Sequence, residues 1–194
     1  RFCRKCGTYL SVKGKIWKGE SSQEEKGKAT VEDIFPYDPY PQQLEFMRDI
    51  QKVLGAGKVL VAEACNGFGK TISALSRVLS FGKKVIYATR THEQVRQVLH
   101  EVAQINKRVG IDFSAVALAS RQNLCLNETC KRLSTIDAVE TCRILRQKHE
   151  CPYKAEHSRL LYLPKVLSIR LLLRYGKTNG VCPYFLSRKV AENC

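Results

Sequence analysis

A glycine-rich segment in the first half of the chain has the composition of a phosphate-binding loop. It reads ACNGFGKT and runs from Ala64 to Thr71, with alanine where this pattern usually begins on glycine. Its glycines let backbone N–H groups approach phosphate oxygens, and a following helix adds the positive end of its dipole. Lys70 would bridge the β and γ phosphates, and Thr71 would hold Mg²⁺. We predict an ATP and Mg²⁺ site here, with Lys70 and Thr71 as its catalytic pair. The predicted contacts are Asn66, Gly67, Phe68, Gly69, Lys70 and Thr71.

The same three letters, GKT, occur again at residues 176–178. There they follow an apolar helical pattern and precede an Asn-Gly turn, and no strand leads into them. A phosphate loop needs a strand before it and a helix after it. We therefore predict that this second GKT ends a helix, which runs to about Tyr175 and stops at Gly176.

The chain holds nine cysteines, which is many for 194 residues. Five of them lie between residues 125 and 182, where irregular spacing fits an iron–sulfur cluster, a zinc site or scattered buried thiols. At the N-terminus, Cys3 and Cys6 precede Gly7 in a knuckle that suits Zn²⁺; two free thiols at a frayed end are the less favoured alternative. Cys65 and Cys194 are predicted not to be ligands.

The net charge is +15, and residues 119–194 carry fourteen basic against six acidic side chains. Such a balance favours a polyanionic partner such as nucleic acid, although a solvated basic surface would also account for it. No apolar run is long enough to span a membrane and no signal peptide is visible. The phosphate-loop pattern favours an intracellular protein, in which disulfides are rare. The chain begins at Arg1 rather than methionine, and we expect a fragment of a longer protein.

Three predicted strands alternate with helices in the first two thirds of the chain. The strand patterns cover residues 58–64, 83–89 and 112–119, and the helical patterns cover 44–54, 70–81 and 92–105. This order predicts an α/β fold with a parallel sheet and right-handed crossovers. After Ser120, cysteines and short helices replace the strands. One of these helices begins with a capping box at Ser134 and Asp137 and has an apolar stripe.

Five sequence motifs, in their order along the chain, resemble the N-terminal part of XPD-type iron–sulfur DNA helicases of superfamily 2. They are FPYDPYPQQLEFMRDIQKVL, EACNGFGKT, VIYATRTHEQV, ASRQNLC and CPYFLSR. The resemblance implies an incomplete RecA-like domain with a small, mainly helical cluster domain inserted into it. It also implies an ATP-driven, monomeric enzyme that moves 5′→3′ on single-stranded or forked DNA in the cytoplasm or the nucleus. The expected divisions are a knuckle (1–17), a linker (18–34), the ATP-binding half-domain (35–118) and the cluster region (119–194).

The resemblance also assigns site residues. It places a [4Fe–4S] cluster on Cys125, Cys142, Cys151 and Cys182, with Cys130 as a rival ligand. Gln43 stands where the family has a glutamine that senses the adenine base. Thr89, Arg90 and Thr91 match the loop that touches the DNA backbone. Candidate phosphate contacts beside the cluster are Arg121, Lys131, Arg132, Arg143, Arg146 and Lys148.

Hydrolysis of ATP at such a loop also needs an Asp-Glu pair at the end of a strand. The sequence contains no such pair, and KAEH at residues 154–157 only imitates its tail. We therefore expect these residues to bind nucleotide weakly and not to unwind DNA by themselves. Two alternatives remain: a non-catalytic iron–sulfur nucleic-acid-binding protein with a relic loop, and a zinc-dependent regulator that uses the N-terminal knuckle.

Overall fold

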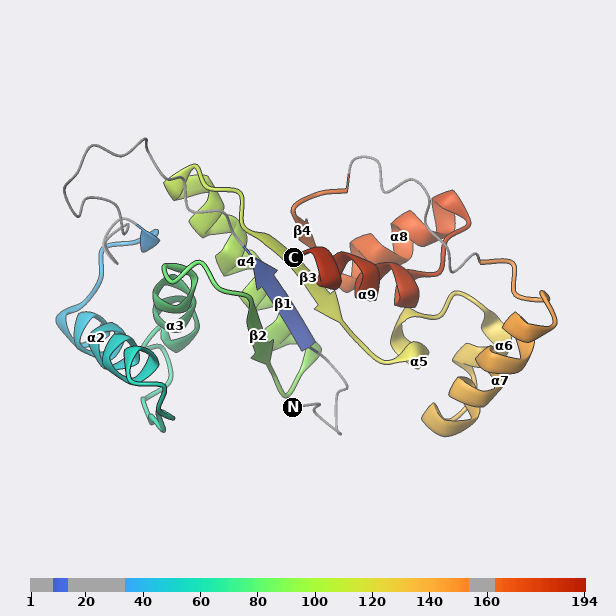
Figure 1. Cartoon of the computed structure of the whole chain (residues 1–194), viewed down its shortest axis with the longest axis horizontal. Coiled ribbons are helices and arrows are strands. Elements are labelled where there is room, and N and C mark those ends of the chain that lie inside the picture. Colours follow the sequence, from blue (N-terminus) through green and yellow to red (C-terminus); the bar gives the residue numbers. More distant parts are fainter. Residues whose placement is uncertain (1–8, 14–33, 154–162) are drawn as a thin grey trace.

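The structure, a computed structural model, describes residues 9–13, 34–153 and 163–194. The described elements alternate between strands and helices, which confirms the predicted α/β class (Figure 1). In chain order they are β1 (Tyr9–Lys13), α2 (Pro41–Gly55), α3 (Lys70–Leu79), β2 (Val85–Ala88), α4 (His92–Val109), β3 (Ser114–Leu118), α5 (Arg121–Leu124), α6 (Glu128–Lys131), α7 (Thr135–Gln147), β4 (Val166–Leu167), α8 (Ile169–Asn179) and α9 (Pro183–Asn193).

The four described strands form one sheet in the order β2-β1-β3-β4. β4 pairs parallel with β3, whereas β1 pairs antiparallel with both β2 and β3. β2 and β3 therefore run in the same direction, as predicted, but β1 separates them. The sheet is mixed rather than wholly parallel, because a strand from the N-terminal segment fills the space between the two predicted neighbours.

Helices cover both faces of the sheet and define two apolar cores. One core joins α2, α3 and α4 to the face that carries Ala115 and Ala117. The other joins α8 and α9 to the face that carries Val116. Since successive residues of a strand point to opposite faces, β3 contributes to both cores. Five residues of α4 are buried along one side, as its apolar spacing predicts: Val95, Val98, Leu99, Val102 and Ile105.

The prediction of a strand at residues 58–64 is wrong. This segment has no regular secondary structure, and the side chains of Val59 and Val61 are 89% and 92% exposed. A β-strand is stabilised by hydrogen bonds to a neighbouring strand, and the described sheet does not extend to this segment. Apolar β-branched residues alone therefore did not make the segment a strand.

The region after β3 is mainly helical, as predicted. α5, α6 and α7 lie at one end of the molecule, away from α2 and α3 (Figure 1). The hydroxyl of Ser134 accepts a hydrogen bond from the backbone N–H of Asp137, which confirms the predicted cap of α7. The apolar stripe of α7 is not buried, since Ile136 and Val139 are exposed and Ala138 is its buried residue.

The predicted end of the following helix is also wrong. α8 continues through Gly176 and ends at Gly180, which adopts the left-handed conformation. Gly176 is buried because Pro183 and the carbonyl of Val181 lie against its Cα. The second GKT therefore lies inside a helix, where it cannot form a phosphate loop. None of the helices in the described ranges has both the length and the apolar character that crossing a bilayer requires.

Candidate nucleotide site and thiol cluster

The segment before α3 has the geometry of an anion-binding loop. Gly67 and Gly69 have φ angles of 83° and 81°, in the left-handed region that glycine adopts without strain. Gly69 is the N-cap of α3, so the unpaired N–H groups of the first helical turn face the loop. Lys70 begins that turn, as the sequence predicts. Its ammonium donates hydrogen bonds to the carbonyls of Ala64 and Cys65, both at 2.7 Å.

A hollow of about 590 Å³ lies beside this loop. The loop side is lined by Asn66, Gly67, Gly69, Lys70, Thr71 and Ile72. The opposite side comes from the end of β2 and from α4, with Arg90, Gln94 and Glu101 among its polar residues. The predicted contacts Asn66, Gly67, Gly69, Lys70 and Thr71 are thus brought together at one cavity. Such a cavity has room and donors for a triphosphate group.

Gln43 does not line this hollow. Its side chain is buried, and its Nε2 donates a hydrogen bond of 2.7 Å to the carbonyl of Phe68. Its Oε1 accepts a hydrogen bond of 2.9 Å from the backbone N–H of Tyr40. The ring of Phe68 packs edge to face against Phe46 of α2, so its side chain also points toward α2.

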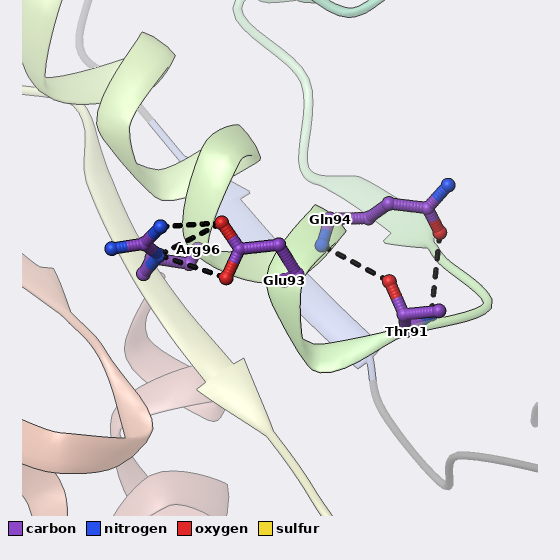
Figure 2. A network of polar contacts seen from close by, with 4 residues as sticks. All are labelled: Thr91, Glu93, Gln94 and Arg96. Atoms are coloured by element: carbon purple, nitrogen blue, oxygen red, sulfur yellow. Dashed lines mark hydrogen bonds and ion pairs between the residues drawn. The ribbon is translucent and has the colours of Figure 1, made fainter.

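The segment predicted to touch DNA forms the connection between β2 and α4. Figure 2 shows how this connection is fixed: the hydroxyl of Thr91 accepts from the N–H of Gln94, and the side chain of Gln94 reaches back. Its Oε1 accepts from the N–H groups of Arg90 and Thr91 at 3.0 and 3.2 Å. The side chains of Arg90 and Thr91 are exposed, whereas Thr89 is buried and its hydroxyl donates to the carbonyl of Thr91. Two of the three predicted contacts are therefore accessible to a ligand.

Five cysteines from separate segments are close enough to act on one another electrostatically, near the end of the molecule that α5 to α7 occupy. They are Cys125, Cys130, Cys142, Cys151 and Cys182. Burial, with a smaller effect of neighbouring Cys130 and Cys142, raises the pKa of Cys125 to about 11. Burial also raises the pKa of Cys130, with smaller electrostatic contributions from Cys142 and Cys151. Burial therefore disfavours the thiolate form of Cys125 and Cys130, and the neighbouring thiols are close enough to affect them.

Both zinc sites and iron–sulfur clusters are held by four ligands, and cysteine thiolates serve in either. Within the ranges 34–153 and 163–194, no three histidine, cysteine, aspartate or glutamate side chains are arranged to hold one metal ion. A zinc site draws four sulfurs to about 2.3 Å from one ion. An iron–sulfur cluster instead binds each thiolate to a different iron, and so accepts a wider set of sulfurs. The five thiols are soft donors of the type that either group uses.

Arg121 links the thiols to α9. Its Nη1 donates to the sulfur of Cys142 at 3.0 Å, and its guanidinium lies 4.5 Å from the centroid of the Tyr184 ring. Arg146 stacks on the neighbouring ring of Phe185 at 4.2 Å. The guanidinium predicted as a DNA contact thus has partners inside the protein, which position α7 against α9.

Comparison with known proteins places these features in a family. The family model DEAD_2 matches residues 87–194, which is more than half of the chain. The chain belongs to the DEAD_2 family. The match includes the loop after β2, all five clustered cysteines and Arg121, whereas the phosphate loop precedes it.

Curated relatives of this DEAD_2 chain are named as helicases. It is 32% identical over 199 residues to the "General transcription and DNA repair factor IIH helicase subunit XPD/RAD3" of Saccharomyces cerevisiae, covering 83% of this chain and 25% of the yeast protein. It is 30% identical over 196 residues to the XPD subunit of Arabidopsis thaliana, covering 84% and 26%. A "Regulator of telomere elongation helicase 1 homolog" of Caenorhabditis briggsae is 26% identical, covering 81% and 20%. The chain spans about a quarter of the length of these relatives.

Some site features were missed by the sequence-based predictions. The Thr91-x-x-Gln94 pattern is a capping-box signal and could have been found. The contact of Phe46 with Phe68 and the stacking of Arg121 on Tyr184 depend on tertiary packing, for which the sequence offers no spacing rule. Cys3, Cys6, the predicted linker and KAEH at 154–157 lie outside the described residues.

Proposed function

We propose that this chain is the ATP-binding front part of a DNA helicase that moves 5′→3′. The proposal rests most on one observation, the loop of Gly67 and Gly69 with Lys70 at the first turn of α3. Membership of a family whose curated relatives are named helicases supports the wider assignment. DNA would be the partner in single-stranded or forked form, and the protein would act as a monomer inside the cell.

In this proposal, residues of the loop and of α3 bind the triphosphate. Backbone N–H groups from Gly67 to Thr71 would donate to phosphate oxygens, since they lie at the positive end of α3. Lys70 would exchange its two carbonyl partners for the β and γ phosphates, and the hydroxyl of Thr71 would bind Mg²⁺. The ammonium is exposed and already lies at the loop, so this exchange requires only rotation of its side chain. These residues alone would bind ATP without unwinding DNA.

The thiol cluster would hold a [4Fe–4S] group through Cys125, Cys142, Cys151 and Cys182. Cys130 is the alternative ligand, because its thiol lies in the same neighbourhood. Such a group would tie together the end of α5, helix α7, the segment after α7 and the start of α9, where the four thiols lie. At the N-terminus, Cys3 and Cys6 would form part of a Zn²⁺ site.

Single-stranded DNA would cross the connection between β2 and α4 and pass beside the thiol cluster. The exposed side chains of Arg90 and Thr91 would contact its phosphates, because backbone contacts by basic residues supply most non-specific affinity. Arg121 would contribute from a half-buried position, with part of its guanidinium already in contact with Cys142 and Tyr184. Exposed basic residues of α6 and α7 would extend the path.

The proposal is tested by a strand-unwinding assay on the complete gene product with Lys70→Ala. We expect loss of ATP-driven unwinding, while affinity for single-stranded DNA in the absence of nucleotide stays within about twofold of wild type. Unwinding at the wild-type rate would exclude this loop as the motor's nucleotide site. Loss of DNA affinity together with unwinding would mean that the variant damages the fold.

A further inference from the structure

Helix α2 approaches the tip of the phosphate loop at two points. At the first, the amide of Gln43 joins the backbone of Tyr40 to the carbonyl of Phe68, with hydrogen bonds of 2.9 and 2.7 Å. At the second, the rings of Phe46 and Phe68 meet edge to face, with centroids 5.9 Å apart and planes at 74°. Gln43 is 6% exposed, so both ends of its amide are used inside the protein.

The hydrogen bond to Phe68 has a consequence for the next residue. A trans peptide is planar, so the carbonyl of Phe68 and the N–H of Gly69 point in opposite directions. Because the carbonyl points at Gln43, the N–H of Gly69 points away from α2. Gly69 lines the hollow beside the loop, where a phosphate oxygen would need this donor.

The fit around Gly69 is close. A Cβ placed on Gly69 would lie 2.5 Å from Nε2 of Gln43, so the amide packs directly on the glycine. The φ angle of Gly69 is 81°, which a side chain would disfavour. Glycine at this position thus allows the close approach of the amide as well as the turn of the loop.

We propose that α2 is a latch on the phosphate loop, in which Gln43 and Phe46 hold Phe68 so that the N–H of Gly69 faces the triphosphate. Gln43 is then a positioning residue, and the loop recognises the triphosphate irrespective of the base. This inference rests on the proposed nucleotide function and names what shapes its site. It differs from the role that the family resemblance implies for Gln43, which is contact with adenine.

Three probes separate these roles: ATP, GTP and inorganic tripolyphosphate, each with Mg²⁺ and titrated into the full chain. Gln43→Ala should weaken all three by a similar factor of about threefold to tenfold, as expected for loss of the one hydrogen bond that reaches the loop. An adenine contact would instead weaken ATP alone. Lys70→Ala sets the background for binding outside the loop, and Gln42→Ala, the exposed neighbour on the same helix, is the matched control.

Gln43→Glu distinguishes the latch from simple stabilisation of α2. Its carboxylate can still accept the N–H of Tyr40, so the helix start is kept. It cannot donate to the carbonyl of Phe68, and two oxygens would face each other there. We expect an unchanged melting temperature, weaker binding of all three probes and faster hydrogen exchange of the amides at residues 67–70 without nucleotide. Phe46→Leu should give a smaller effect in the same pattern.

The outcomes are distinct for the two proposals. If wild type binds none of the three probes above the Lys70→Ala background, the nucleotide function itself is wrong. If wild type binds all three and Gln43→Glu matches it, the latch is wrong while the nucleotide function stands. An effect of Gln43→Ala on ATP alone would also overturn the latch and restore the adenine contact.

Discussion

At the scale of single residues, the five clustered thiols give a direct test of the proposed ligands. Protein purified without oxygen should carry about four irons per chain if a [4Fe–4S] cluster is present. Serine at Cys125, Cys142, Cys151 or Cys182 should lower the iron content and bleach the brown colour, because a ligand must be a thiolate. Iron and acid-labile sulfide analysis checks this.

Cys65→Ser is the matched control, because this thiol is exposed in the phosphate loop, away from the cluster. Cys130→Ser should also keep its iron, although its thiol lies beside the others. If Cys130→Ser loses the colour and Cys142→Ser keeps it, Cys130 is the cluster ligand in place of Cys142. Zinc in place of iron would exclude the [4Fe–4S] cluster.

A second residue-scale prediction concerns Arg90. Arg90→Ala should weaken binding of single-stranded DNA and lower the slope of log affinity against log salt by about 0.7, the value for one phosphate contact. Arg96→Ala is the control, because Arg96 pairs with Glu93 one turn along α4 (Figure 2). Affinity should be measured by fluorescence anisotropy over a range of salt concentrations. Equal slopes for Arg90→Ala and wild type would remove Arg90 from the DNA path.

The residue scale also shows what local sequence can and cannot predict. The glycine turn at residues 67–69 and the start of α3 were predictable from eight consecutive residues, whereas the strand expected before them does not form in the described structure. Arg121 stays a predicted DNA contact, but its contacts with Cys142 and Tyr184 were not predictable, because both partners are distant in sequence. Only packing decides whether such a basic residue faces solvent.

At the scale of elements, Gly176 in α8 allows a prediction with an unusual sign. Alanine normally stabilises the interior of a helix relative to glycine by about 1 kcal/mol. At Gly176 a Cβ would lie 2.6 Å from the carbonyl of Val181 and 2.5 Å from Pro183, so Gly176→Ala should destabilise by about 1–3 kcal/mol. Urea unfolding measures the change. Gly55→Ala, at the end of α2 with open space around it, should be neutral or stabilising.

Where some helices and strands begin and end also depends on contacts between residues that are distant in sequence. The helix α4 was predicted well because its apolar period is long and its face is buried as a whole. α8 was predicted to end at Gly176, since a glycine often ends a helix, but here the glycine accommodates Pro183. Residues 58–64 carry the composition of a strand, whereas a strand also needs a neighbour, and pairing cannot be derived from the segment's own sequence.

At the scale of the whole molecule, the loop before α3 and the thiols around α7 lie toward opposite ends, with the sheet and its covering helices between them (Figure 1). The alternation of strands and helices was enough to predict the α/β class. The position of β1 between β2 and β3 was not predicted, because its five residues lie far from both strands in the sequence. The order of strands in a sheet is a property of the assembled chain.

The central claim is that the first GKT binds nucleotide and the second does not. Titration of ATP and Mg²⁺ into the full chain should give the same affinity for wild type and for Lys177→Ala, since Lys177 is an exposed residue of α8. Lys70→Ala should bind about tenfold to a hundredfold more weakly, because it loses charge-assisted hydrogen bonds to phosphate. Wild-type affinity in Lys70→Ala, or an equal loss in Lys177→Ala, would contradict the claim.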